Sequence, residues 1–202
     1  MDKQAIKLKA RGFLNPVVSV LGDLGVSPFL ISLLGVGLSI VGAVVLAGGR
    51  LFWAGIILLG AGLCDVIDGS LARSRNMASR FGAFIDSTFD RIAEFACFGG
   101  IFVYLIERPQ GFGLLEYLAA FVALTGSILT SYTRARAEGL GLACSVGLFE
   151  RPERIALMVL GLILGRYVLF GVLMILGAVT VLTSIQRILH VYKLTRGDIP
   201  SD

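Results

Sequence analysis

Four aspartates stand in two closely spaced pairs in the first half of the chain. Asp65 and Asp68 are three residues apart, and Asp86 and Asp90 are four residues apart. On a helix, either spacing places both side chains on one face. Because a turn near residues 74–80 would join the two helices, both pairs can converge. The sequence therefore predicts an acidic site shared by two consecutive helices.

Four carboxylates held close together repel one another unless cations neutralise them. Hard oxygen ligands with no histidine or thiolate alongside favour Mg²⁺, Mn²⁺ or Ca²⁺ over zinc, and one or two such ions would fit. Magnesium in turn suggests a phosphate-bearing substrate. Arg73, which follows the first pair, can bind a phosphate through two hydrogen bonds. Glu94, one turn beyond Asp90, either extends the set of ligands or pairs with Arg91.

The helices that carry these acids belong to a chain that is too apolar for a soluble enzyme. Of its 202 residues, 56% are hydrophobic and 16% are charged, and the mean hydropathy is +0.86. An ordinary soluble domain has roughly 25% charged residues. The composition excludes a soluble globular enzyme and a disordered chain, and it indicates an integral membrane protein.

Apolar runs divide the chain into six candidate membrane spans, because a helix needs about 20 apolar residues to cross the hydrocarbon. Three runs carry no charge, namely 24–49, 117–133 and 167–186. Three more are long enough if charged residues at one end are included, namely 51–73, 81–106 and 151–166. We therefore expect an all-α, polytopic membrane protein with six transmembrane helices.

The placement of basic residues predicts how these spans are oriented. Arg50, Arg108 and Arg166 fall at turns on one face, whereas the other 15 of the 18 Lys and Arg fall toward the opposite face. Since cytoplasmic loops carry the excess of Lys and Arg, we expect both termini and the acidic site to face the cytoplasm, in a multi-pass protein of the cytoplasmic membrane.

The N-terminal segment is expected to lie on the membrane rather than in it. Residues 1–23 mix basic and large apolar side chains, which is typical of an amphipathic helix in the interface, here broken near Asn15 and Pro16. Residues 24–193 would form the six-helix bundle. With no repeat or linker visible, residues 1–202 are expected to form a single domain.

The acidic segments contain eight residues at fixed spacing. They read Asp65-x-x-Asp68-Gly69-x-x-Ala72-Arg73 and, after eight further residues, Gly82-x-x-x-Asp86-x-x-x-Asp90. This pattern resembles the complete signature of the CDP-alcohol phosphatidyltransferase family. The six spans derived separately are the architecture that this family has.

The resemblance implies transfer of a phosphatidyl group from a CDP-linked lipid to an alcohol hydroxyl, with release of CMP. The ligands that it implies for two ions of Mg²⁺ or Mn²⁺ are Asp65, Asp68, Asp86 and Asp90. The residues that it implies for binding the CDP-linked lipid are Asp65, Asp68, Gly69, Ala72 and Arg73. Asp90 would also take the proton from the acceptor hydroxyl. A homodimer is expected on the same resemblance.

A second basic cluster follows the fourth span. The positive-inside rule accounts for Arg134, Arg136 and Arg151. It does not account well for Arg187, which ends a long uncharged run and needs a partner or a wet cavity. A phosphate on the acceptor would supply that partner.

The segments around this cluster resemble the subfamily that makes phosphatidylinositol phosphate, or its archaeal ether-lipid counterpart, from inositol phosphate. The segments are Ser131 to Ala137, with the sequence SYTRARA, and Glu150 to Arg154, with the sequence ERPER. The resemblance implies that Arg134, Arg154 and Arg187 bind the phosphate of the acceptor.

Two other functions remain open alternatives. Glycerol 3-phosphate also carries a phosphate, although members that use it usually begin the first span with an asparagine-rich, Leu-Thr-Leu-Arg entry, where this chain has Val26-Ser27-Pro28. A cation-coupled transporter also places acids in the membrane, but it usually holds them near the midplane with repeat symmetry. Ester-linked and ether-linked lipid donors are equally compatible with the apolar spans.

Overall fold

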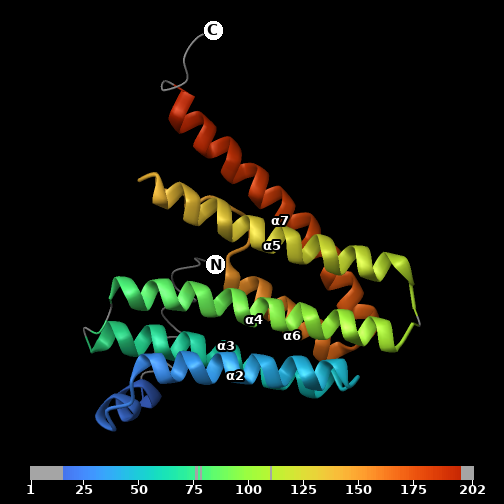
Figure 1. Cartoon of the computed structure of the whole chain (residues 1–202), viewed down its shortest axis with the longest axis horizontal. Coiled ribbons are helices and arrows are strands. Elements are labelled where there is room, and N and C mark those ends of the chain that lie inside the picture. Colours follow the sequence, from blue (N-terminus) through green and yellow to red (C-terminus); the bar gives the residue numbers. More distant parts are fainter. Residues whose placement is uncertain (1–15, 76, 78, 110, 197–202) are drawn as a thin grey trace.

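The computed structural model describes residues 16–75, 77, 79–109 and 111–196, and every regular element in these ranges is a helix (Figure 1). The helices are α2 (Pro28–Ala47), α3 (Leu51–Ser74), α4 (Arg80–Glu107), α5 (Leu114–Gly139), α6 (Arg151–Leu164) and α7 (Arg166–Thr195). A helical segment over residues 16–23 precedes them. The predicted all-α class is confirmed.

Each predicted span corresponds to one of these helices, with differences at the ends. The first begins at Pro28 rather than at residue 24, because Gly25 adopts a positive φ of 69° in a turn that a helix cannot include. Pro28 suits the first helical turn, where its missing N–H has no partner to lose. The last helix runs on to Thr195, nine residues beyond the predicted end at 186.

Four of the helices, α2, α3, α5 and α7, are long and apolar enough to cross a membrane by length and composition. Helices α4 and α6 do not meet that measure within the described residues, since α4 carries several charges and α6 has 14 residues. The structure thus supports an integral membrane protein with at least these four candidate spans.

Part of the predicted interfacial helix, residues 1–15, lies outside the described residues. The described remainder, 16–23, is not merely solvated. Val18 is buried and packs with Ile31 of α2 and Leu71 of α3.

Helix α2 packs against both α3 and α4, α6 packs against α3 and α7, and α5 packs along α7 (Figure 1). One apolar core joins all six labelled helices, with Leu46, Ala54, Ile101, Ala120 and Leu162 among its most buried members. The C-terminal part of α7 projects beyond the other helices. Helices α3 and α4 each pack against α2, and the acidic residues of both helices line one cavity.

The turns predicted to share one face do meet at one end of the bundle. Arg166 binds Glu116 through Nε at 2.9 Å and Nη2 at 2.5 Å, and its Nη1 donates to the Arg108 carbonyl at 2.7 Å. Arg108 in turn donates to the carbonyls of Ala47 and Gly48 at 3.1 and 2.8 Å. These contacts tie three turns together at the end opposite the aspartates.

Candidate active site

Three of the four predicted metal ligands form a compact cluster. Carboxylate oxygens of Asp65 and Asp68 on α3 and of Asp86 on α4 all lie within 4.8 Å of one another. Asp68 is 5% exposed, and the Ser32 hydroxyl of α2 donates to its Oδ2. Three carboxylates in reach of one point suit a hard divalent cation such as Mg²⁺ or Mn²⁺.

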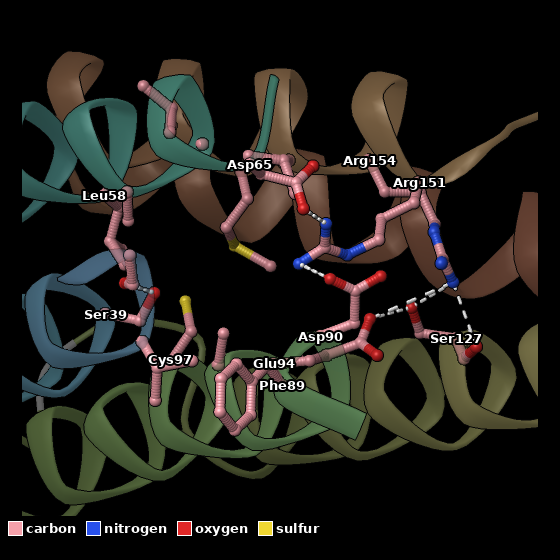
Figure 2. A pocket seen from close by; sticks show the side chains of 18 of the residues that line it. Ser39, Leu58, Asp65, Phe89, Asp90, Glu94, Cys97, Ser127, Arg151 and Arg154 are labelled. Atoms are coloured by element: carbon pink, nitrogen blue, oxygen red, sulfur yellow. Dashed lines mark hydrogen bonds and ion pairs between the residues drawn. The ribbon is translucent and has the colours of Figure 1, made fainter. Parts of the chain in front are cut away.

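The fourth predicted ligand, Asp90, lines the same cavity but pairs with an arginine. Arg151, the first residue of α6, places Nη2 2.7 Å from Asp90 Oδ1 and Nη1 2.9 Å from Asp65 Oδ1. Figure 2 shows this guanidinium lying between the two carboxylates. One side chain from α6 thereby connects the acids of α3 and α4.

All four aspartates line one cavity of about 100 Å³ inside the bundle. Apolar side chains from several helices form the rest of its wall, among them Leu58, Phe98 and Met158. The cavity thus has an acidic side and an apolar side, which suits a ligand that carries both phosphates and hydrocarbon.

A second, larger cavity of about 740 Å³ brings the three predicted acceptor residues, Arg134, Arg154 and Arg187, together. The residues that it shares with the first cavity are Asp86, Asp90, Arg151 and Arg154. The arginine-lined space therefore adjoins the acidic one, with Asp90 at the boundary.

Arg187 binds neutral oxygens, and Arg154 binds neutral oxygens beside a glutamate. Arg187 is 4% exposed, and its guanidinium donates to the carbonyls of Val146, at 2.9 Å, and Thr130. Arg154 is 6% exposed, donates to the Ser127 carbonyl at 2.9 Å and places Nη1 3.9 Å from Glu94 Oε1. Its Nε has no hydrogen-bond partner within the described part of the chain. Carbonyl partners orient a guanidinium but leave its positive charge available to an anion.

The third arginine is differently placed. Arg134 is exposed, and its Nε lies 2.8 Å from Glu138 Oε1 one turn along α5. An exposed pair of this kind is weak and can exchange partners. Arg134 can thus exchange Glu138 for a ligand in the cavity without breaking a buried contact.

Three further signature residues lie beyond the acids on α3. Neither described cavity wall includes Gly69, Ala72 or Arg73. The Arg73 guanidinium folds back over Gly69, where a Cβ would lie 3.3 Å from Nη1. Their predicted contact with a cytidine diphosphate group stays a prediction.

Two contacts at the site were not predicted from the sequence. Ser32 carried no signal, because its partner Asp68 lies 36 residues away on another helix. For Arg151 the sequence offers topology as an explanation, although a cation at the N-terminus of a helix opposes the helix dipole and is a signal for a partner elsewhere. Of the two roles considered for Glu94, the structure shows the ion pair with Arg91.

Comparison with known proteins agrees with this geometry. The family model described as CDP-alcohol phosphatidyltransferase matches residues 25–186. The phosphatidylinositol phosphate synthase of Mycobacteroides abscessus is 33% identical over 91% of this chain and 84% of its own length. The archaetidylinositol phosphate synthase of Methanothermobacter thermautotrophicus is 36% identical over 73% of each chain.

Solved structures of the phosphatidylinositol phosphate synthase of Mycobacterium tuberculosis share the fold at 31% identity. The structure with CDP-DAG bound has a TM-score of 0.76 and covers 88% of this chain and 92% of that one. The structure with manganese and citrate has a TM-score of 0.79 and covers 88% of each. The signature, the helical bundle and these matches together show that the chain belongs to the CDP-alcohol phosphatidyltransferase family.

Proposed function

We propose that this enzyme transfers a phosphatidyl or archaetidyl group from a CDP-linked lipid to inositol phosphate and releases CMP. The observation that carries the proposal is the adjoining pair of cavities, one walled by aspartates and one by arginines, which share Asp90 and Arg151. A reaction between a nucleotide-activated lipid and a phosphorylated alcohol needs two such sites side by side. The names of the relatives support the same acceptor.

On the donor side, Asp65, Asp68, Asp86 and Asp90 would hold two divalent ions, Mg²⁺ or Mn²⁺. Ions bound there would offset the charge of the pyrophosphate and of the departing CMP. Gly69, Ala72 and Arg73 would contact the cytidine diphosphate group, while the lipid tails stay in the bilayer. The carboxylate cluster of Asp65, Asp68 and Asp86 supports the metal site.

On the acceptor side, Arg134, Arg154 and Arg187 would bind the phosphate of inositol phosphate. The hydrogen bonds of Arg187 to neutral carbonyls support this assignment, since such partners leave its positive charge available to a phosphate. Asp90 would accept the proton of the attacking hydroxyl, because it is an aspartate that lines both cavities and therefore meets acceptor and donor.

The decisive test supplies purified protein with CDP-diacylglycerol or its ether analogue, a divalent ion, and one labelled alcohol at a time. We expect CMP release with inositol phosphate and little with glycerol 3-phosphate, inositol or serine. Asp86→Asn is expected to abolish transfer, by at least about a hundredfold, without unfolding the protein. Faster turnover with glycerol 3-phosphate would replace the proposed acceptor, and normal turnover by Asp86→Asn would remove the metal assignment.

We also propose that all six helices span the cytoplasmic membrane, with both termini and both cavities toward the cytoplasm, and that the enzyme is a homodimer. The arginine-rich cavity lies at the end where most of the Lys and Arg gather, which supports the orientation. Family resemblance supports the dimer.

A further inference from the structure

Arg151 makes a contact that the proposed reaction does not explain. Its guanidinium reaches Asp65 on α3 and Asp90 on α4 at the same time, with N–O distances of 2.9 and 2.7 Å (Figure 2). All three side chains are largely shielded, with 21%, 31% and 17% of the respective side-chain surfaces exposed. The bridge therefore links three helices inside the cavity rather than at the surface.

The position of Arg151 is unfavourable for α6 itself. It is the first residue of that helix, where the helix dipole favours negative charge, and Pro152 fixes the helix start directly after it. The helix dipole therefore gives no reason for an arginine at this place. The aspartates across the cavity give the reason for it.

The charge at the site is strongly unbalanced without this residue. Four aspartates line the cavity, and across the described ranges Arg151 is the cation that forms ion pairs with any of them. Asp68 and Asp86 have no ion-pair partner among these residues. Carboxylates this close repel one another, so a fixed positive charge between the two helices holds the site together.

We infer that Arg151 is the internal counter-ion of the aspartate site. It holds Asp65 and Asp90 in place when no metal is bound, and its charge opposes the entry of divalent ions and so sets how tightly they bind. Arg151 is thus a positioning residue. The inference rests on the proposed metal site, and it adds a group outside the aspartate signature that tunes the affinity of that site.

The test compares Arg151→Gln and Arg151→Lys with the wild-type protein in detergent. One measurement is the melting temperature in EDTA, and the other is the dissociation constant for Mn²⁺ by titration calorimetry. Without the counter-ion, Arg151→Gln is expected to melt at least about 3 °C lower in EDTA. It is also expected to bind Mn²⁺ about tenfold more tightly, because the repulsion is gone. Arg151→Lys keeps the charge and should stay within about threefold of the wild-type affinity.

A matched control is Arg75→Gln, which removes the exposed ion pair between Arg75 and Asp23 and leaves the cavity intact. It should change neither measurement. A folded Arg151→Gln protein with an unchanged melting temperature in EDTA, or with unchanged or weaker Mn²⁺ binding, overturns the inference and leaves the proposed function standing. Failure of the wild-type protein to bind Mn²⁺ overturns the proposed metal site and the inference with it.

Discussion

Ser32 and Ser39 stand on the same helix, α2, and line the same cavity, yet their hydroxyls have different partners. The Ser32 hydroxyl lies 3.2 Å from the Pro28 carbonyl of its own helix and also donates to Asp68 Oδ2 of the carboxylate cluster. The Ser39 hydroxyl donates to the Gly35 carbonyl of its own helix at 3.0 Å. A hydrogen bond to a carboxylate orients it and is stronger than one between neutral groups. Of the two serines, only Ser32 is placed to position a metal ligand.

Replacing Ser32 is therefore expected to weaken metal binding. Loss of a hydrogen bond to a charged group costs about 1.5–3 kcal/mol, so Ser32→Ala should raise the Mn²⁺ dissociation constant about ten- to a hundredfold. Ser39→Ala serves as the control and should leave that constant unchanged. Equal effects of the two substitutions would show that the hydroxyl of Ser32 does not orient Asp68.

Arg187 provides a test of the acceptor site. With its charge removed in Arg187→Gln, the KM for inositol phosphate should rise about ten- to a hundredfold, because a buried charge-assisted bond to phosphate is lost. The KM for the CDP-linked lipid should change less than about threefold. Arg136→Gln removes an exposed charge of α5 that lies outside the cavity wall, and it should alter neither value. Equal rises in both KM values would place Arg187 outside the acceptor site.

At the residue level, the sequence was most informative where spacing along one helix decides the outcome. The intervals between Asp65 and Asp68 and between Asp86 and Asp90 indicated which side chains share a face, and the acids do line one cavity. The partners contributed by other helices could not be predicted in this way. Arg151 meets its carboxylates across more than 60 residues of chain, so only packing brings them together.

The helices themselves extend further than their uncharged runs, for a physical reason. Charged residues were expected to end the spans, yet Glu116 lies two residues inside α5, 2% exposed, because Arg166 neutralises it. Arg187 likewise continues α7, because backbone carbonyls satisfy its guanidinium. A sequence read by hydropathy alone cannot show that such a charge has a partner.

The packing of α2 on α4 depends on a glycine. A Cβ placed on Gly100 would lie 2.6 Å from the carbonyl oxygen of Ala43, and backbone atoms cannot move aside as a side-chain tip can. Its neighbour Gly99 has nothing within 4 Å of the corresponding position. The two adjacent glycines thus allow the close approach to be tested separately from helix propensity.

Gly100→Ala is expected to destabilise the bundle by about 1–3 kcal/mol, because α2 must shift away from α4. Gly99→Ala should be neutral or stabilising, by up to about 1 kcal/mol, since alanine favours the helix. Melting temperatures in the same detergent compare the two. A loss of stability by Gly99→Ala as large as that of Gly100→Ala would show that the contact with Ala43 is not the cause.

At the scale of the whole molecule, the two ends of the bundle use charge differently. At one end Arg166 and Glu116 neutralise each other, and Arg108 and Arg166 both lie over the Tyr104 ring at 5.6 and 5.5 Å. At the other end the aspartates and arginines line two open cavities. The first end serves to hold the turns together, whereas the charges of the second line cavities that a ligand can enter.

Helices α4 and α6, which contribute to both cavities, are not apolar or long enough to be recognised as membrane spans by themselves within the described residues. Whether each of them crosses the membrane is tested by labelling its two ends. Exposed positions flank both of them. Met77 and Leu114 lie on either side of α4, and Leu148 and Tyr167 lie on either side of α6. A single cysteine at each position, in a chain whose three native cysteines are replaced, reports the side of the membrane that it faces.

We expect Leu114→Cys and Tyr167→Cys to react with a membrane-impermeant maleimide in intact cells, and Met77→Cys and Leu148→Cys to react only in inverted vesicles. The positive-inside rule fixes this order, because the excess of Lys and Arg lies on the side of residues 77 and 148. If both cysteines flanking a helix react from one side, that helix does not cross. Since Asp86 and Asp90 of α4 and Arg151 and Arg154 of α6 enclose the shared part of the two cavities, such a result for either helix would also remove the proposed cytoplasmic opening of the site.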